Sequence, residues 1–150
     1  ILQKKVGKIT NILGRRPKML VGKPGLDGHS NGAEQIAVRA RDVGFEVVYD
    51  GIRSSPDQLV NTCIEEGINI VGLSILSGSH LFLVDEFLKL LKKVNFQNIP
   101  IVVGGIIPPS DEKKLLKQGV SAVFTPKNFQ IFDIMDEIVK IVEKRFEKNN

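Results

Sequence analysis

The chain has 150 residues, 42% of them hydrophobic and 25% charged, which suits one domain with a single core. It contains no run of about 18 apolar residues and does not begin with the apolar segment of a secretory signal, so the sequence predicts no membrane association and no export. The net charge of +4 is modest. The single cysteine, Cys63, cannot form an internal disulfide, which favours a cytoplasmic location, and its apolar neighbours Leu59, Val60 and Ile64 indicate a packed thiol.

The first segment, residues 1–16, is predicted to form a short amphipathic helix that ends near Gly14. Its apolar positions share one stripe: Val6, Ile9, Ile12 and Leu13. The start of the chain, residues 1–18, contains no acidic residue beside its six basic ones: Lys4, Lys5, Lys8, Arg15, Arg16 and Lys18. No aromatic side chains interleave with them, so nucleic-acid binding is disfavoured. We interpret residues 1–16 as a linker helix from an upstream domain, an interpretation that the start at isoleucine supports, and residues 17–150 as the main domain.

Five strand-then-helix repeats follow this linker. Short apolar runs predict strands at residues 18–22, 46–49, 68–73, 99–103 and 122–124. Apolar residues at helical spacing predict helices at residues 31–43, 55–67, 80–91, 110–119 and from 131 toward the end. Local signals mark several helix ends. Ser55 with Gln58 predicts a capping box, Ser110 is predicted as a cap, and Gly67 and Gly119 are predicted to stop their helices.

Strands that alternate with helices of this length require right-handed crossovers and a parallel sheet with helices on both faces. Five such units suit the flavodoxin-like strand order 2-1-3-4-5. In that order a crevice opens between the first and third strands, at their carboxyl ends.

The loop after the first strand carries the most distinctive residues of the chain. Asp27 precedes His29 by two positions, and Gly28 between them permits a sharp bend. A histidine that binds a metal usually has its second ring nitrogen held by a carboxylate or carbonyl, which Asp27 could supply. The same residues also suit an ordinary turn with a solvated histidine, and the loop alone leaves both interpretations open.

Two further loops of small residues are expected at the same edge of the sheet. Ser74 follows the third strand, and Gly104 with Gly105 ends the fourth strand. The crevice therefore faces His29 on one side and small residues on the other, which leaves room for a bulky planar ligand or its tail.

Three motifs in this arrangement resemble the cobalamin-binding domains of acyl-CoA mutases: Asp27-x-His29-x-x-Gly32, Ser74-x-Leu76 and Gly104-Gly105. The resemblance covers residues 16–145. Within this family, residues 27–35, 103–109 and 125–129 are most similar to the ethylmalonyl-CoA mutase branch. Methylmalonyl-CoA mutases typically have a glycine-rich turn where this chain has Thr125 and Pro126, so that branch is the second choice.

The resemblance implies a set of cofactor-binding residues. His29 would bind the cobalt of base-off cobalamin, Asp27 would hold its far nitrogen, and Lys23 would pair with Asp27. The displaced nucleotide tail would contact residues of the three later loops: Ser74, Leu76, Gly78, Gly104, Gly105, Phe124, Thr125 and Pro126. Gly28 and Gly32 complete the first loop. His80 has no expected role on cobalt and is predicted to anchor a loop.

The resemblance also implies a function for the longer protein. That protein would be an isomerase that uses adenosylcobalamin to rearrange the carbon skeleton of an acyl-CoA, with ethylmalonyl-CoA as the first candidate substrate. Its acyl-CoA would bind a separate barrel domain or subunit, the full enzyme would be a homodimer, and this domain alone would be inactive. The alternatives are a methylmalonyl-CoA mutase domain or small subunit, and a corrinoid protein that carries methyl groups.

Overall fold

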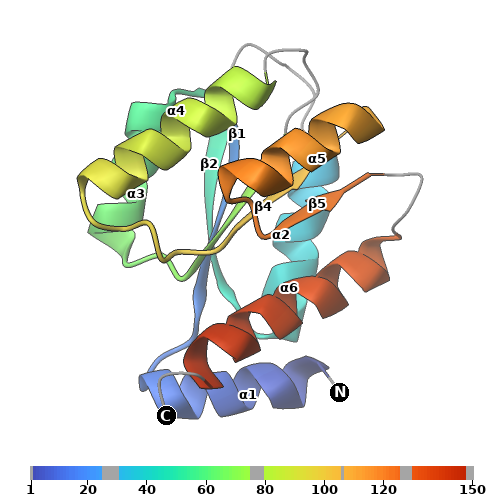
Figure 1. Ribbon diagram of the computed structural model, residues 1–150. Helices are drawn as coiled ribbons and strands as arrows, with labels where there is room; N and C mark the ends of the chain where they lie inside the picture. Colours follow the sequence, from blue (N-terminus) through green and yellow to red (C-terminus); the bar gives the residue numbers. More distant parts are fainter. Residues whose placement is uncertain (1, 25–30, 75–79, 106, 126–129, 148–150) are drawn as a thin grey trace.

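The computed structural model describes residues 2–24, 31–74, 80–105, 107–125 and 130–147. In these residues helices and strands alternate along the chain (Figure 1). The helices are α1 (Leu2–Leu13), α2 (Asn31–Val43), α3 (Pro56–Glu66), α4 (His80–Lys93), α5 (Pro109–Gln118) and α6 (Ile131–Glu147). The strands are β1 (Lys18–Pro24), β2 (Glu46–Ser54), β3 (Ile70–Ser74), β4 (Ile101–Gly104) and β5 (Ala122–Phe124).

The strands form one sheet in the order β2-β1-β3-β4-β5, and every neighbouring pair is parallel. This is the flavodoxin-like order predicted from the sequence, and it is confirmed. Because all the strands point the same way, their carboxyl ends meet at one edge of the sheet, which is where doubly wound folds bind their ligands.

Two hydrophobic layers cover the two faces of the sheet. Helices α3, α4 and α5 pack on one face, while α1, α2 and α6 pack on the other (Figure 1). We call these the α4 face and the α6 face. Side chains alternate between them along each strand, so that in β3 Ile70 belongs to the α6 face and Val71 to the α4 face. Both residues are fully buried, as expected for a central parallel strand.

Local sequence signals set several of the helix ends. At α3 the Ser55 side chain accepts from the Gln58 N–H (3.2 Å), and the Gln58 side chain accepts from the Ser55 N–H (2.8 Å), which confirms the predicted capping box. Gly67 and Gly119 follow α3 and α5 with φ of 65° and 119°, in the left-handed region that favours glycine at a helix stop.

The predicted cap of α5 is wrong. The helix begins at Pro109, and its N-cap is Pro108, whose carbonyl accepts the N–H groups of Asp111 and Glu112 (both 3.0 Å). Proline at the first helical position keeps the preceding residue extended, so the helix starts before Ser110.

Strand boundaries also differ from the prediction. The β2 strand continues to Ser54 because its pairing with β1 passes through two register shifts, around Lys23, that the sequence does not show. Strand β3 begins at Ile70 instead of residue 68, because the Ile68 N–H bonds back to the Cys63 carbonyl (3.3 Å) and so completes the end of α3.

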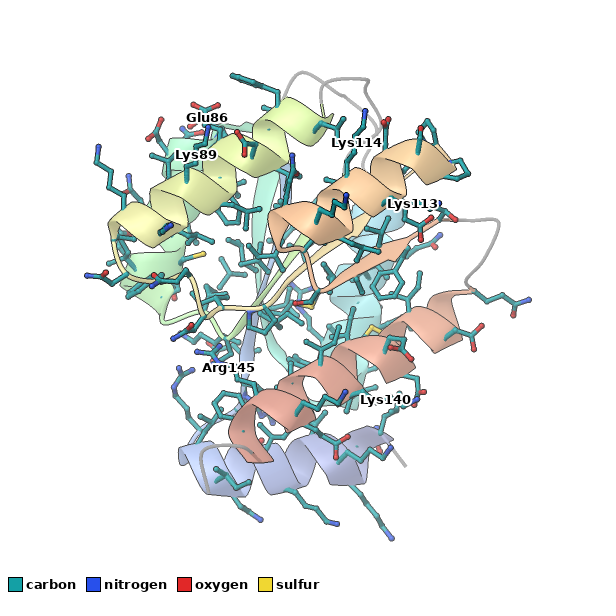
Figure 2. All side chains as sticks on the ribbon, viewed as in Figure 1. Glu86, Lys89, Lys113, Lys114, Lys140 and Arg145 are labelled. Carbon is teal, nitrogen blue, oxygen red and sulfur yellow. The ribbon has the colours of Figure 1, made fainter. Side chains whose placement is uncertain are left out.

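Polar contacts tie the elements together at the amino edge of the sheet. The buried Asn69 side chain accepts from the Lys18 backbone N–H (2.8 Å). The backbone carbonyl of Asn69 accepts from the guanidinium of Arg145 (2.7 Å), which α6 carries (Figure 2). Burial lowers the pKa of Arg145. Lys18 also pairs with Glu66 (3.3 Å) and, more loosely, with Glu46 (3.8 Å).

Helix α1 packs against α6 and α2 at the lower end of the molecule (Figure 1). Val6 and Ile9 are 1% and 2% exposed and belong to the core of the α6 face. The predicted apolar stripe is only partly buried, because Ile12 is 48% exposed. The role of this helix as a linker from an upstream domain stays a prediction. No helix in the described part of the chain is both long and apolar enough to span a membrane.

Candidate functional site

The structure describes about half of the residues predicted to bind the cofactor. Six of them lie outside the described residues: Asp27, Gly28, His29, Leu76, Gly78 and Pro126. The others lie at the carboxyl ends of the strands or at the start of α2: Lys23, Gly32, Ser74, Gly104, Gly105, Phe124 and Thr125. The predicted cobalt ligand and its carboxylate partner therefore remain predictions, while the surface beside them can be examined.

Four of the described residues form one row across the sheet. Ser74 pairs with Gly104, and Gly104 pairs with Phe124. Lys23 lies one position beyond Gly22, whose partner is Leu73, the residue before Ser74. The row runs along the carboxyl edge, so residues far apart in the sequence lie at one height because the hydrogen-bonded register aligns them.

The small residues of β3 and β4 at this edge lie on one of the two faces of the sheet. Alternation places Gly72, Ser74 and Gly104 on the α6 face, because their neighbours Leu73 and Val103 point into the core of the α4 face. The carboxyl end of the sheet thus carries two glycines and a serine on one side and large apolar side chains on the other. A ligand that enters beside β3 and β4 must therefore lie between the sheet and the helices of the α6 face.

The helix above this surface is also lined with small residues. Ala37 and Ala40 of α2 are 3% and 0% exposed and pack into the α6 face. At the far end of the row, Phe124 and Thr125 are both buried, at 4% and 8% exposure. Thr125 is one of two buried polar residues among the described side chains, together with Asn69. The described part of the candidate site is therefore a strip of small residues flanked by the buried Phe124 and Thr125, and we call this strip the candidate channel.

The two consecutive glycines of β4 play different structural roles. Among the described residues, a β-carbon at Gly104 would meet only the Phe124 carbonyl oxygen, at 3.8 Å, so the glycine leaves space that a ligand can use. Gly105 has φ of 152°, which strains other residues, and its N–H donates to the same carbonyl (3.1 Å). Gly104 fits a cofactor cradle, while Gly105 shapes the backbone.

Two residues of this channel were not included in the predicted site. Gly72 lies two pairs below Ser74 on the same face, and the spacing of two along a strand was the signal available for it. Tyr49 of β2 packs against the α6 face, and its buried hydroxyl has no hydrogen-bond partner within the described residues. No sequence pattern indicated this feature, because it depends on the tertiary surroundings.

The remaining candidates for chemistry are less suited to it. Cys63 is 1% exposed, and burial raises its pKa to about 12, so the thiol stays protonated and packs in the core as predicted. His80 is the first residue of α4, and its role as a loop anchor stays a prediction.

A hollow of about 720 Å³ lies between α1 and the end of α2, away from the carboxyl edge. Four of the side chains that line it are basic: Lys4, Lys8, Arg16 and Arg41. The described residues that line it include no aromatic ring on which a nucleic-acid base could stack.

The fold defines this chain as a doubly wound parallel α/β domain, with small residues at the carboxyl ends of β3 and β4. A family model described as B12 binding domain matches residues 17–128. The chain belongs to this family.

Comparisons with individual proteins agree with the resemblance found in the motifs. Ethylmalonyl-CoA mutase of Methylorubrum extorquens is 53% identical over 136 residues, which cover 91% of this chain and 20% of that protein. Methylmalonyl-CoA mutase of Rhizobium meliloti is 34% identical over 143 residues, which cover 95% of this chain and 20% of that protein. The solved structure of a cobalamin-binding protein from Desulfitobacterium hafniense shares the fold, with a TM-score of 0.71 at 21% identity, covering 96% of this chain and 67% of that one.

The higher identity to ethylmalonyl-CoA mutase confirms the branch that the motifs indicated. The chain spans about a fifth of the length of the curated relatives it matches.

Proposed function

We propose that this chain is the cobalamin-binding domain of an adenosylcobalamin-dependent acyl-CoA mutase, with ethylmalonyl-CoA as the first candidate substrate. The observation that carries the proposal is the aligned row of Ser74, Gly104 and Phe124 at the carboxyl edge of the sheet, in a chain that matches the B12 binding domain family. The 53% identity to an ethylmalonyl-CoA mutase supports the choice of reaction and substrate. Methylmalonyl-CoA remains the second candidate.

In this proposal the first loop holds the metal. His29 would bind the cobalt, Asp27 would accept from its second ring nitrogen, and Lys23 would pair with Asp27. An imidazole held in this way is a suitable ligand for cobalt, because the carboxylate fixes its orientation and raises its basicity. Gly28 and Gly32 let the backbone of the loop approach the corrin.

The channel on the α6 face holds the nucleotide tail of the cofactor. Ser74 and Gly104 line its floor, with Leu76, Gly78 and Gly105 beside it. The segment from Phe124 to Pro126 closes around its end. When bound, the cofactor supplies the homolytic cobalt–carbon chemistry that carbon-skeleton rearrangement needs. This chain contributes the ligand, the position and the exclusion of water from the tail.

The acyl-CoA binds elsewhere in the proposed enzyme. A substrate-binding barrel, as a separate domain or subunit, covers the upper face of the corrin, and the full enzyme is a cytoplasmic homodimer. The match covers 20% of each of the two mutases, which supports a separate part of the enzyme for the acyl-CoA. The chain alone should therefore bind cobalamin but give no rearranged acyl-CoA, because reactive intermediates must be shielded from water.

Electron paramagnetic resonance of bound cob(II)alamin tests the proposal, with the chain labelled with ¹⁵N at histidine. The sequence contains two histidines, which provide a matched pair of variants. The wild type and His80→Ala should show one ¹⁵N nucleus coupled to cobalt, and His29→Ala should lose it. Coupling to the unlabelled benzimidazole nitrogen in the wild type would contradict the proposal, as would a signal that survives in His29→Ala.

A further inference from the structure

The hydroxyl of Tyr49 is buried, yet it makes no hydrogen bond. Its oxygen exposes less than 1 Å² of surface, and none of the described residues serves it as donor or acceptor. It is the one buried side-chain polar atom in this state among the described residues. Buried polar groups in folded proteins are nearly always paired, so an orphaned phenol requires an explanation.

The position of Tyr49 relates it to the channel. Tyr49 of β2 pairs with Val21 of β1, and Val21 pairs with Gly72 of β3. These residues form a second row, directly below the row that contains Ser74. Neighbouring strands are about 5 Å apart, so the backbone of Tyr49 is about 10 Å from Gly72, with Val21 between them.

The surroundings of the ring are apolar. Tyr49 packs against the core of the α6 face, which includes Val21, Ala37 and Ala40. Phenylalanine would fill the same space without burying a hydroxyl. Burying the unpaired hydroxyl therefore destabilises the cofactor-free protein. A bound molecule that accepts a hydrogen bond from the hydroxyl would remove this cost.

The tail of the proposed cofactor is such a molecule. The row of Ser74 and Gly104 lies on the same face as Tyr49. Gly72 lies between the two rows, and the terminal methyl group of Met19, a flexible side chain, packs over it. A nucleotide tail brings phosphate and ribose oxygens, and these acceptors lose their water when they enter an apolar face.

From these observations we infer that Tyr49 binds the nucleotide tail of cobalamin, by donating a hydrogen bond from its hydroxyl to a tail oxygen. The inference rests on the proposed function. It adds a tail-binding residue from β2, a strand on which the sequence motifs placed no part of the site. It also explains why a partnerless hydroxyl is retained under α2.

Binding measurements with Tyr49→Phe test the inference, with two corrinoids and the 150-residue chain. Absorbance titration of hydroxocobalamin should show an affinity about 5- to 100-fold lower than that of the wild type, the range expected when a buried acceptor is left unpaired. Cobinamide, which lacks the nucleotide tail, should bind both proteins with the same affinity. Thr10→Val is the matched control, because its hydroxyl donates to the Val6 carbonyl (3.0 Å) on α1, away from the channel. It should leave both affinities unchanged.

A spectroscopic measurement examines the hydroxyl directly. Tyr49 is the only tyrosine of the chain, so tyrosine labelled with ¹³C at the ring carbon that bears the hydroxyl gives a single NMR signal. This signal should shift when diamagnetic cob(III)alamin binds, and it should keep its position with cob(III)inamide. Cofactor-free Tyr49→Phe should melt at or above the temperature of the wild type, since no bond is lost.

The outcomes separate this inference from the proposed function. Equal affinities of the wild type and Tyr49→Phe for cobalamin would overturn the inference alone, as would an equal loss with both corrinoids. A lower melting temperature of cofactor-free Tyr49→Phe would also overturn it, because the hydroxyl would then have a partner without cofactor. Failure of the wild type to bind cobalamin in the base-off form would overturn both.

Discussion

Gly104 and Gly72 lie on the same face of the sheet, two pairs apart in the register of β3 and β4, but their surroundings differ. A β-carbon at Gly104 would have one neighbour, the Phe124 carbonyl oxygen at 3.8 Å, which is an ordinary contact. At Gly72 it would come within 2.7 Å of the terminal methyl of Met19, a side chain with no exposed surface. The first glycine leaves space at the channel, whereas the second permits close packing inside the core.

This difference leads to a prediction for alanine at each position. Gly104→Ala should leave the free energy of unfolding of the cofactor-free protein nearly unchanged, while it lowers cobalamin affinity by about tenfold or more, because the methyl group enters the tail channel. Gly72→Ala is the matched control and should lower the free energy of unfolding by about 1 kcal/mol, because Met19 must move within a packed core. Urea denaturation and absorbance titration measure the two effects.

Wild-type affinity in Gly104→Ala would show that the tail does not pass this residue. Gly105 cannot serve as a second test, because its φ of 152° makes any substitution strained before a ligand is considered.

The sequence identified residues at the carboxyl edge of the sheet, but it did not show the separate role of each residue. Gly104 and Gly105 were recognised as a pair, but only backbone angles and neighbouring atoms distinguish an open position from a strained one. Tyr49 could not be recognised at all. A tyrosine in an apolar strand normally indicates a packed ring, and a missing partner for its hydroxyl becomes visible only when the residues around it are placed.

Helices α3 and α5 begin in two different ways. The start of α3 has a serine whose side chain accepts from the backbone, while α5 starts with two prolines and has no side-chain cap. A serine near the start is therefore not sufficient to identify a cap. Ser110 satisfied the local rule, but Pro109 before it had already fixed the first helical position.

We expect Ser55→Ala to lower the free energy of unfolding by about 1 kcal/mol, the usual effect of removing an N-cap acceptor. Ser110→Ala should change it by less than about 0.5 kcal/mol, since this exposed serine lies inside the first turn of α5. Chemical denaturation of both variants makes the comparison. Equal losses would mean that Ser110 caps α5 in solution, and that the observed start of this helix is incorrect.

Helix types and order were predictable, but several strand ends were not. Hydrophobic periodicity identified each helix because it extends over several turns. Strand ends depend on pairing partners. The polar stretch before Ser54 belongs to β2 only because β1 pairs with it through bulges, and Ile68 lies outside β3 because its N–H completes α3. Such long-range contacts leave little trace in the local sequence.

For the molecule as a whole, the position of α1 bears on where the domain begins. The predicted linker packs on α6 and places Ile9 in the core of the α6 face, while Ile12, one turn later, is exposed. A helix that only connects two domains would not need a buried face against this one. The family model, in comparison, begins at residue 17.

Alanine substitutions at Ile9 and Ile12 test whether α1 is part of the folded domain or only connects it to another domain. If α1 is part of the folded domain, Ile9→Ala should lower the free energy of unfolding by about 2–4 kcal/mol, because a buried side chain leaves a cavity. Ile12→Ala removes an exposed side chain of the same type and should change it by less than about 0.5 kcal/mol. Small and equal effects would show that α1 does not contribute to the stability of the domain and serves only as a connector.

The row of Lys23, Ser74, Gly104 and Phe124 has a consequence for when the protein can acquire its cofactor. Each residue comes from a different strand, and the last of them, on β5, precedes only α6 in the described chain. A ribosome delivers β1, an inner strand of the sheet, first and the edge strand β5 last of the five. The channel has no closed end until β5 joins β4, so a nascent chain that already displays His29 still lacks part of the tail site. On the proposed function, the complete tail site would therefore form only after β5 has been synthesised, too late for cobalamin to guide the early steps of folding.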